Sequence, residues 1–129
     1  MAQVKIYGLK HHLETKREQL STVIHQCVME VFGMPAGKRA HRFFLMDAAN
    51  FLAPDGRSEA YTIIEITIIA GRTIETRKRL IRLLFEKIAA DIGIQPNDIE
   101  ICIIESPACN WGFRGLIGDE ANLNYAINI

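Results

Sequence analysis

The chain has 129 residues, of which 49% are hydrophobic and 23% are charged, a composition that excludes disorder and a collagen-like repeat and predicts one domain with a real core. Fifteen Lys and Arg balance fifteen Asp and Glu, so the formal charge of zero gives no reason to expect nucleic acid or an anionic membrane as a partner. A neutral chain also resists aggregation poorly, which favours a stable oligomer that hides apolar surface.

The first part of the chain is typical of a strand, a helix and a second strand. Val4 and Ile6 alternate with more polar neighbours, which predicts a strand over about residues 2–8. A second strand is expected at about residues 40–47, where the apolar run is too continuous for a strand with one face in water, so it should be well buried. Between them, apolar residues at three-and-four spacing mark one face of a helix that Gly33 ends: Leu20, Val23, Ile24, Cys27, Val28, Val31 and Phe32.

The second part of the chain has the same order of elements. A turn-rich loop at residues 53–58 separates the two parts. Residues 61–69 are rich in β-branched side chains and predict the strongest strand. Gly71-Arg72-Thr73 leads into a helix that Gly93 ends, and a fourth strand is expected from Ile99 to Glu105.

A repeat with an offset of 60 positions relates these two parts. It superposes Gly33 on Gly93 and Ile6 on Ile66. It also aligns Ala-Ala-Asn-Phe, which ends at Phe51, with Ala-Cys-Asn-Trp, which ends at Trp111, without a gap. The chain therefore contains a repeated strand-helix-strand unit.

The repeat predicts an α/β (α+β) domain in which tandem β-α-β units form one four-stranded mixed sheet. Right-handed crossovers related by a pseudo-twofold axis place both helices on one face of that sheet. Residues 1–129 then form a single domain, with a first unit at 1–58, a second at 59–110 and a C-terminal oligomerisation segment at 111–129. Because the other sheet face is rich in Ile and has nothing to cover it, we expect self-association.

With Gly-Arg-Thr before the second helix and Asn-Trp-Gly-Phe-Arg-Gly at residues 110–115, this repeat resembles the tautomerase superfamily over nearly the whole chain. The branch that it most resembles is that of malonate semialdehyde decarboxylase and its uncharacterised relatives. The resemblance implies a homotrimer and tautomerase-like chemistry on a small oxo acid. We expect neither a cofactor nor a metal.

The resemblance also locates the family's key residues in this chain. Ala2 stands where the family has its catalytic amino-terminal proline. The family's acidic residue falls on Lys38 in one alignment and on His41 in another. One of its two substrate-binding arginines matches Arg72, and the other falls on Ala70. Activity is therefore expected to be weak or altered.

Three candidate site residues follow from chemistry as well as from the resemblance. Once Met1 is removed, the α-amine of Ala2 has an ordinary pKa of about 7.7 to 8.0, which suits proton transfer. Arg72 and the N–H groups of a helix start can hold a carboxylate, and the alternative is a solvated arginine near a helix end. Lys38 is a candidate for a Schiff base or for a basic pocket whose other members would be Arg39, Arg42, Arg57, Arg72 and Arg114.

Roles can also be predicted for the tryptophan and the cysteines. Trp111 either forms a wall of the pocket or anchors a subunit boundary. Cys27 and Cys102 should pack as small hydrophobes, whereas Cys109 lies in a loop. The cysteines lack C-x-x-C spacing, and no two histidines have the spacing of a helical metal site. We therefore expect neither a zinc site nor a disulfide framework.

Three functions remain open at this point. The chain is either a tautomerase-like enzyme of weak or altered activity on a small oxo acid, a non-catalytic binder of small carboxylates, or a purely structural homotrimer. The amino terminus lacks an apolar segment after a basic start, so a cytoplasmic protein with no membrane partner is expected.

Overall fold

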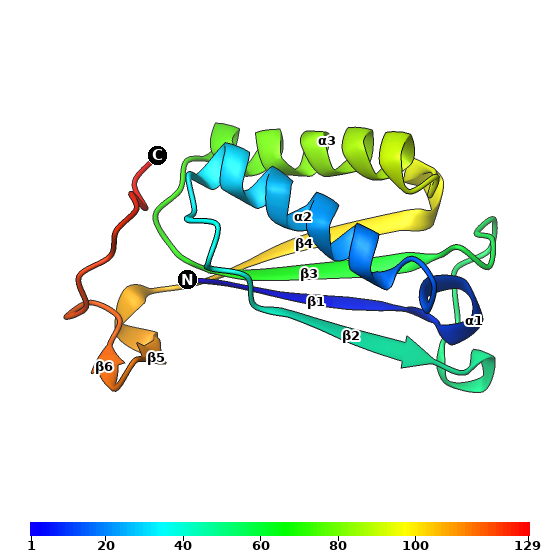
Figure 1. Ribbon diagram of the computed structural model, residues 1–129, viewed down its shortest axis with the longest axis horizontal. Helices are drawn as coiled ribbons and strands as arrows, with labels where there is room; N and C mark the ends of the chain where they lie inside the picture. Colours follow the sequence, from blue (N-terminus) through cyan, green and yellow to red (C-terminus); the bar gives the residue numbers. More distant parts are fainter.

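A four-stranded mixed sheet forms the base of the protein in the computed structural model, which describes residues 1–129 (Figure 1). The strand order is β2-β1-β3-β4. β1 and β3 run antiparallel at the centre, β2 pairs with β1 in parallel, and β4 pairs with β3 in parallel. The strand bounds are Ala2–Leu9 for β1, His41–Met46 for β2, Thr62–Ile69 for β3 and Ile99–Ser106 for β4.

Two long helices, α2 (Arg17–Phe32) and α3 (Ile74–Asp91), lie side by side over one face of this sheet (Figure 1). Gly33 ends α2 in the left-handed conformation, with φ +66°, which a residue without a Cβ adopts readily. The hydroxyl of Thr73 caps α3 by accepting a hydrogen bond from the backbone N–H of Thr76. A short helix, α1 (Lys10–Leu13), precedes α2 and was not expected from the sequence.

The remaining elements are short. Three 3₁₀ turns are present, η1 (Ala48–Asn50), η2 (Pro96–Asp98) and η3 (Ala108–Asn110). The C-terminal segment begins with a two-stranded hairpin, whose strands are β5 (Gly112–Phe113) and β6 (Leu116–Ile117). Beyond Ile117 the chain forms no helix or strand. None of the helices combines the length and the apolar composition that a bilayer crossing requires.

The structure confirms the predicted repeat. β1 and β3 begin and end 60 positions apart, and so do η1 and η3. Gly33 and Gly93 both have positive φ, at +66° and +82°. The antiparallel pairing of β1 with β3 places the pseudo-twofold axis between these two strands, near the pair Lys5 and Glu65. The two crossovers therefore place both helices on one face, as predicted.

The hydrophobic core lies between this sheet face and the two helices. Alternate residues of the central strands point into it, because successive side chains of a strand face opposite sides. Ile6, Ile64 and Ile66 are fully buried there. From the helices, Leu20, Ile24, Leu80 and Leu84 meet them.

Two burial predictions are wrong, both for the same reason. Phe44 in β2 is 40% exposed, although the second strand was expected to be well buried. Cys102 in β4 is exposed, although it was expected to pack as a small hydrophobe. β2 and β4 are the edges of the sheet. Phe44 pairs with Tyr7 and Cys102 with Glu65, which alternate with the buried residues of β1 and β3, so both side chains lie on the face without helices. Cys27, in contrast, is buried on α2 as predicted.

The bare sheet face predicts self-association, because Phe44 and Ile104 are 40% and 41% exposed on it in the single chain. Sedimentation velocity at micromolar concentration should give a mass above the 14.6 kDa of one chain. The substitution Phe44→Glu places a charge on that face and should shift the protein towards 14.6 kDa. Leu52→Glu, at a loop side chain that is 87% exposed, is the control and should leave the mass unchanged. A monomeric parent would contradict the prediction.

Candidate functional site

The candidate site lies at the end of the sheet where β1 begins. The start of β1, the start of α3 and the loop after α2 meet there (Figure 1). Arg72 enters the site because β3 ends at Ile69 and the chain turns through Gly71, with φ +146°, before α3. Lys38 enters it from the loop between α2 and β2. Two of the predicted site residues therefore come from different units of the repeat.

The guanidinium of Arg72 is buried, with 3% of the residue exposed. Its Nη1 donates a hydrogen bond to the backbone oxygen of Ile69 at 3.1 Å, and Nη2 points to the sulfur of Met34 at 3.8 Å. Its Cζ lies 4.5 Å from the ring centre of Phe32 and 6.0 Å from that of Tyr125, both within cation–π range. The alternative of a solvated arginine is therefore wrong, because the Phe32 and Tyr125 rings shield this side chain from water.

No carboxylate neutralises Arg72. Its Nε is buried without an acceptor, and it forms no ion pair. The carboxylate of Glu105 acts on Arg72 electrostatically but is bonded to Arg77, at 3.0 Å. Burial lowers the pKa of Arg72 below its usual value. A buried cation without a partner is costly, so this site favours an incoming anion.

The terminal amine of Met1 lies in the same region. It donates a hydrogen bond to the hydroxyl oxygen of Tyr125. Burial, together with the positive charges of Arg72, Lys38 and Arg114, lowers its pKa from 8.0 to about 5. This amine is therefore neutral at pH 7 and has a lone pair with which to accept a proton.

Ala2 follows as the first residue of β1 and is buried, with 4% of it exposed. Its methyl group faces the helices, as do those β1 residues that alternate with it. The amine that meets the charged groups in this chain is that of Met1. Removal of Met1 would transfer the free amine to the edge of the core.

Lys38 and Trp111 were also predicted as site residues. Lys38 is half-buried, its backbone N–H bonds to the oxygen of Pro35 at 3.0 Å, and its charge acts on the terminal amine. Trp111 is held by its own segment, because its indole N–H donates to the oxygen of Ser106 at 3.2 Å and its carbonyl accepts from Gly118 at 2.7 Å. The Trp111 ring makes no cation–π contact with an arginine.

The predicted basic pocket is smaller than expected. Arg57 lies at the opposite end of the sheet, where it contacts Glu100 at 3.4 Å. Arg42 is exposed on β2 and donates to the side chain of Gln3 at 2.9 Å. Arg114 remains with Arg72 and Lys38, because its charge also lowers the pKa of the terminal amine.

The opposite end of the sheet is the counterpart of the candidate site in the repeat. The residues equivalent by the 60-position offset are Met1 and Tyr61, Lys38 and Asp98, and Arg72 and His12. The hydroxyl of Tyr61 donates to Glu100 at 2.6 Å. Asp98 accepts from the N–H and the hydroxyl of Ser58 at 2.8 and 2.5 Å. Nδ1 of His12 and Nε of Arg57 are buried there without a hydrogen-bond partner, but Arg57 forms an ion pair with Glu100, whereas Arg72 forms none.

Two histidines lie near the loop that carries Lys38. His25 is buried and its Nε2 is 2.8 Å from the oxygen of Ala36, within a hydrogen bond. The Nδ1 of His41 is bonded to the hydroxyl of Ser21 at 2.8 Å, and the two histidine rings are 6.0 Å apart, edge to face. Burial, with the nearby His25 and Arg39, lowers the pKa of His41 to about 4. The hydrogen bonds of both histidines hold this loop in place, and His41 is neutral at pH 7.

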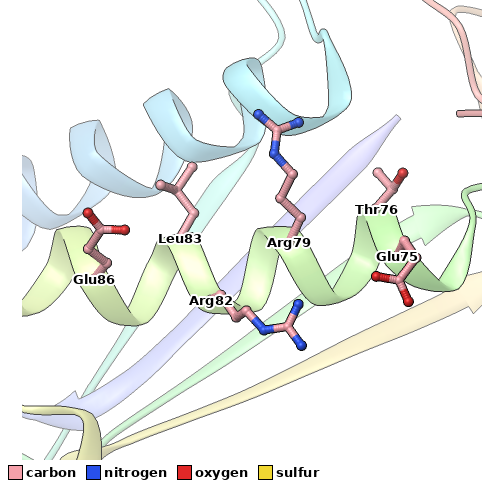
Figure 2. A pocket seen from close by; sticks show the side chains of 6 residues that line it. All are labelled: Glu75, Thr76, Arg79, Arg82, Leu83 and Glu86. Carbon is pink, nitrogen blue, oxygen red and sulfur yellow. The ribbon is translucent and has the colours of Figure 1, made fainter.

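The cavities of the single chain do not reach the side chain of Arg72. The largest, about 440 Å³, is a hollow along α3 with charged groups of both signs (Figure 2). None of the five cavities is lined by Arg72 or Ala2. No group of three His, Cys, Asp or Glu side chains is placed to hold a metal ion. The hollow in Figure 2 is lined by Glu75, Thr76, Arg79, Arg82, Leu83 and Glu86.

Sequence reasoning missed Tyr125, which contacts both Arg72 and the terminal amine. This residue is 53 positions from Arg72 in a segment without periodic hydrophobicity, so no local pattern indicates its place. Phe32 was assigned to the core and also stacks on Arg72. Both contacts arise only when the segments come together in three dimensions.

A family model and a curated relative both place this chain among the tautomerases. A family model described as tautomerase enzyme matches residues 38–114. A probable tautomerase of Ralstonia nicotianae is 35% identical over 54 residues, which cover 42% of this chain and 77% of that protein. The match to the family model includes Lys38, Arg72 and Trp111 but not the amino terminus.

Two solved structures share the fold. A malonate semialdehyde decarboxylase superposes with a TM-score of 0.80 at 22% identity, over 89% of this chain and 93% of that one. A fused 4-OT, solved as an asymmetric trimer, gives a TM-score of 0.81 at 24% identity, over 92% and 97% of the two chains. At these identities the likeness establishes the tandem β-α-β architecture.

The lowered pKa of His41 predicts how stability depends on pH. Its pKa is about 4 in the folded protein and ordinarily 6.5, so the unfolded chain binds the extra proton as the pH falls between these values. The free energy of unfolding should therefore decrease from pH 7 to pH 4, with His41 contributing about 2 kcal/mol after solvent screening. Urea titrations should show a smaller decrease for His41→Gln. His11→Gln, at an exposed histidine, is the control, and an equal effect of both variants would contradict the assignment.

Proposed function

The chain belongs to the tautomerase family, and we propose that it catalyses proton transfer between the enol and keto forms of a small oxo acid at the start of β1. One observation carries this proposal: a buried Arg72 without an ion-pair partner lies in the same region as a terminal amine whose pKa is about 5. One group offers a counter-charge for a carboxylate, and the other is a base at neutral pH.

In the proposed reaction, the guanidinium of Arg72 binds the substrate carboxylate and so fixes the enol beside the amine. The neutral amine accepts the proton of the enol hydroxyl, and the resulting ammonium delivers a proton to the neighbouring carbon, which gives the ketone. Lys38 supports the negative charge that develops on the enol oxygen. Burial contributes by strengthening each of these electrostatic interactions.

The proposed activity is slow, for two reasons. Ala2 replaces the amino-terminal proline, so this chain supplies a primary amine in place of the family's secondary amine. Neither Lys38 nor His41 supplies the carboxylate that the family has near this place. The pocket thus retains anion binding and a base but lacks the second acid–base group.

We also propose a homotrimer whose subunit boundary completes the pocket. The bare sheet face, with Phe44 and Ile104, needs a cover, and the similar fused 4-OT is a trimer. The hairpin of the C-terminal segment presents Trp111, half-buried, beside exposed Leu116 and Ile117. These side chains suit a boundary between subunits, because aromatic residues are enriched there. A second subunit would supply the missing wall of the pocket, since no cavity of the single chain reaches Arg72.

Carboxylate binding should depend on Arg72. The substitution Arg72→Ala removes a charge-assisted hydrogen bond, which typically contributes about 1.5–3 kcal/mol, so affinity for pyruvate should fall about tenfold or more. Isothermal titration calorimetry measures this change. Arg17→Ala, at an exposed arginine of α2, removes the same charge and should bind as the parent does. Equal weakening of both variants would assign the effect to long-range charge and would place the pocket elsewhere.

Enol turnover should be slow and should depend on the amine. Ketonisation of phenylenolpyruvate, followed by absorbance, should have a kcat below about 1 per second. Because the base must be neutral, kcat/KM should fall only as the pH drops through about 5. Ala2→Pro in a sample without Met1 should raise kcat. A fast parent protein would contradict the proposed slow activity. If both proteins bind a carboxylate but neither turns over phenylenolpyruvate, the protein is a non-catalytic carboxylate binder.

A further inference from the structure

The last five residues, 125–129, cross the end of the molecule where β1 and α3 begin (Figure 1). The chain leaves the β5–β6 hairpin, passes the amino terminus and ends beside the start of α3. We call residues 125–129 the strap. It passes over the proposed carboxylate site without forming a helix or a strand.

The first anchor of the strap is Tyr125. Its ring lies 6.0 Å from the Cζ of Arg72 and supplies a second aromatic surface in addition to Phe32. Its hydroxyl oxygen accepts a hydrogen bond from the amine of Met1. A single side chain of the strap thus contacts both groups to which we assign function.

The second anchor is a close approach to Gly71. A Cβ at this position would lie 2.7 Å from Cγ2 of Ile127 and 2.8 Å from Oδ1 of Asn128, closer than side chains tolerate. Gly71 therefore gives the strap room directly before Arg72. The third anchor is the backbone oxygen of Ile129, which accepts hydrogen bonds from the hydroxyls of Thr73, at 3.1 Å, and Thr76.

Little else holds the strap. Within residues 121–129 the backbone makes one hydrogen bond to other backbone, from the N–H of Ile129 to the oxygen of Ile127, and this bond is internal to the strap. Tyr125 and Ile127 are half-buried, and the residues between and after them are exposed. Segments with few buried contacts and few backbone bonds open at low free-energy cost.

We propose that the strap is a displaceable cover: it closes over Arg72 in the empty protein and must lift before a carboxylate reaches the guanidinium. This inference rests on the proposed function for the identity of the ligand. In the closed state Arg72 is a buried cation without a carboxylate, so a carboxylate that enters as the strap lifts compensates the charge. The apparent affinity is then reduced by the fraction of molecules that are open, and weaker anchors tighten binding.

Modification of arginine by phenylglyoxal tests the strap without reliance on a substrate. Peptide mass spectrometry gives the rate at each arginine, and in the parent Arg72 should react much more slowly than exposed Arg17. Thr76→Val keeps the shape of the side chain but removes the hydroxyl that donates to Ile129. This change does not alter a residue that contacts the guanidinium of Arg72. Since one hydrogen bond is lost, Arg72 should react about two- to tenfold faster in this variant. Tyr125→Ala should accelerate it further.

Two internal controls make the result decisive. Arg77 follows Thr76 in the first turn of α3 and should keep the parent rate, because the helix start stays folded. Leu52→Ala changes an apolar side chain, 87% exposed, in the loop between β2 and β3, away from the strap and from the proposed subunit boundary, and should leave the rate at Arg72 unchanged. Three outcomes would contradict the proposed cover. They are an unchanged rate at Arg72 in both strap variants, a rate at Arg72 of the parent equal to that at Arg17, and an equal acceleration at Arg77.

Adding pyruvate separates this inference from the proposed function. Protection of Arg72 by pyruvate, stronger in Thr76→Val than in the parent, supports both. If the variants accelerate modification of Arg72 but pyruvate protects none of the proteins, the strap stands and the carboxylate site is refuted. If pyruvate protects the parent and Thr76→Val at the same concentration and the rates without pyruvate are equal, the site stands and the strap is refuted.

Discussion

Arg72 carries a positive charge into a part of the protein that offers it aromatic rings, a backbone oxygen and a sulfur, but no carboxylate. The arrangement around it follows from this constraint. The terminal amine nearby loses its proton more easily, since burial and the neighbouring cations disfavour a further positive charge. The base and the anion site that we propose thus both depend on one uncompensated charge. The strap then lies over the arginine that most needs a ligand.

The repeat explains why the protein has one such site and not two. A pseudo-twofold axis relates the two ends of the sheet, and η1, η3 and both helix-ending glycines still obey it. At the second end, the hydroxyl of Tyr61 donates to Glu100 and the carboxylate of Asp98 accepts from Ser58, so these two groups are satisfied within the protein. At the first end, Met1, Lys38 and Arg72 stand at the positions equivalent to Tyr61, Asp98 and His12. The two ends have therefore diverged: one holds the fold together, and the other remains open to chemistry.

The fold was predicted well because local patterns carry it. The apolar stripe from Leu20 to Phe32 and the β-branched run at residues 61–69 determine their elements, and the offset of 60 determines the topology. The site was predicted only in part. The resemblance named Arg72 and Lys38, and the structure brings them to the same end of the sheet. The burial of Arg72 was not predicted, and Arg57, which was grouped with them, lies at the opposite end. Edge exposure was also missed at Phe44 and Cys102, because an edge strand and a central strand can share the same composition.

The sequence by itself determined the repeat, the resemblance to the family and the presence of alanine at position 2, since each of these is a matter of residue type and spacing along the chain. Tertiary structure alone decided what surrounds Arg72. The ring of Phe32 comes from α2, that of Tyr125 from the strap and the amine from the start of β1. Burial and pKa depend on the sum of such neighbours, which are distant in sequence and close in space. No local pattern contains that sum, because it exists only once the chain is folded.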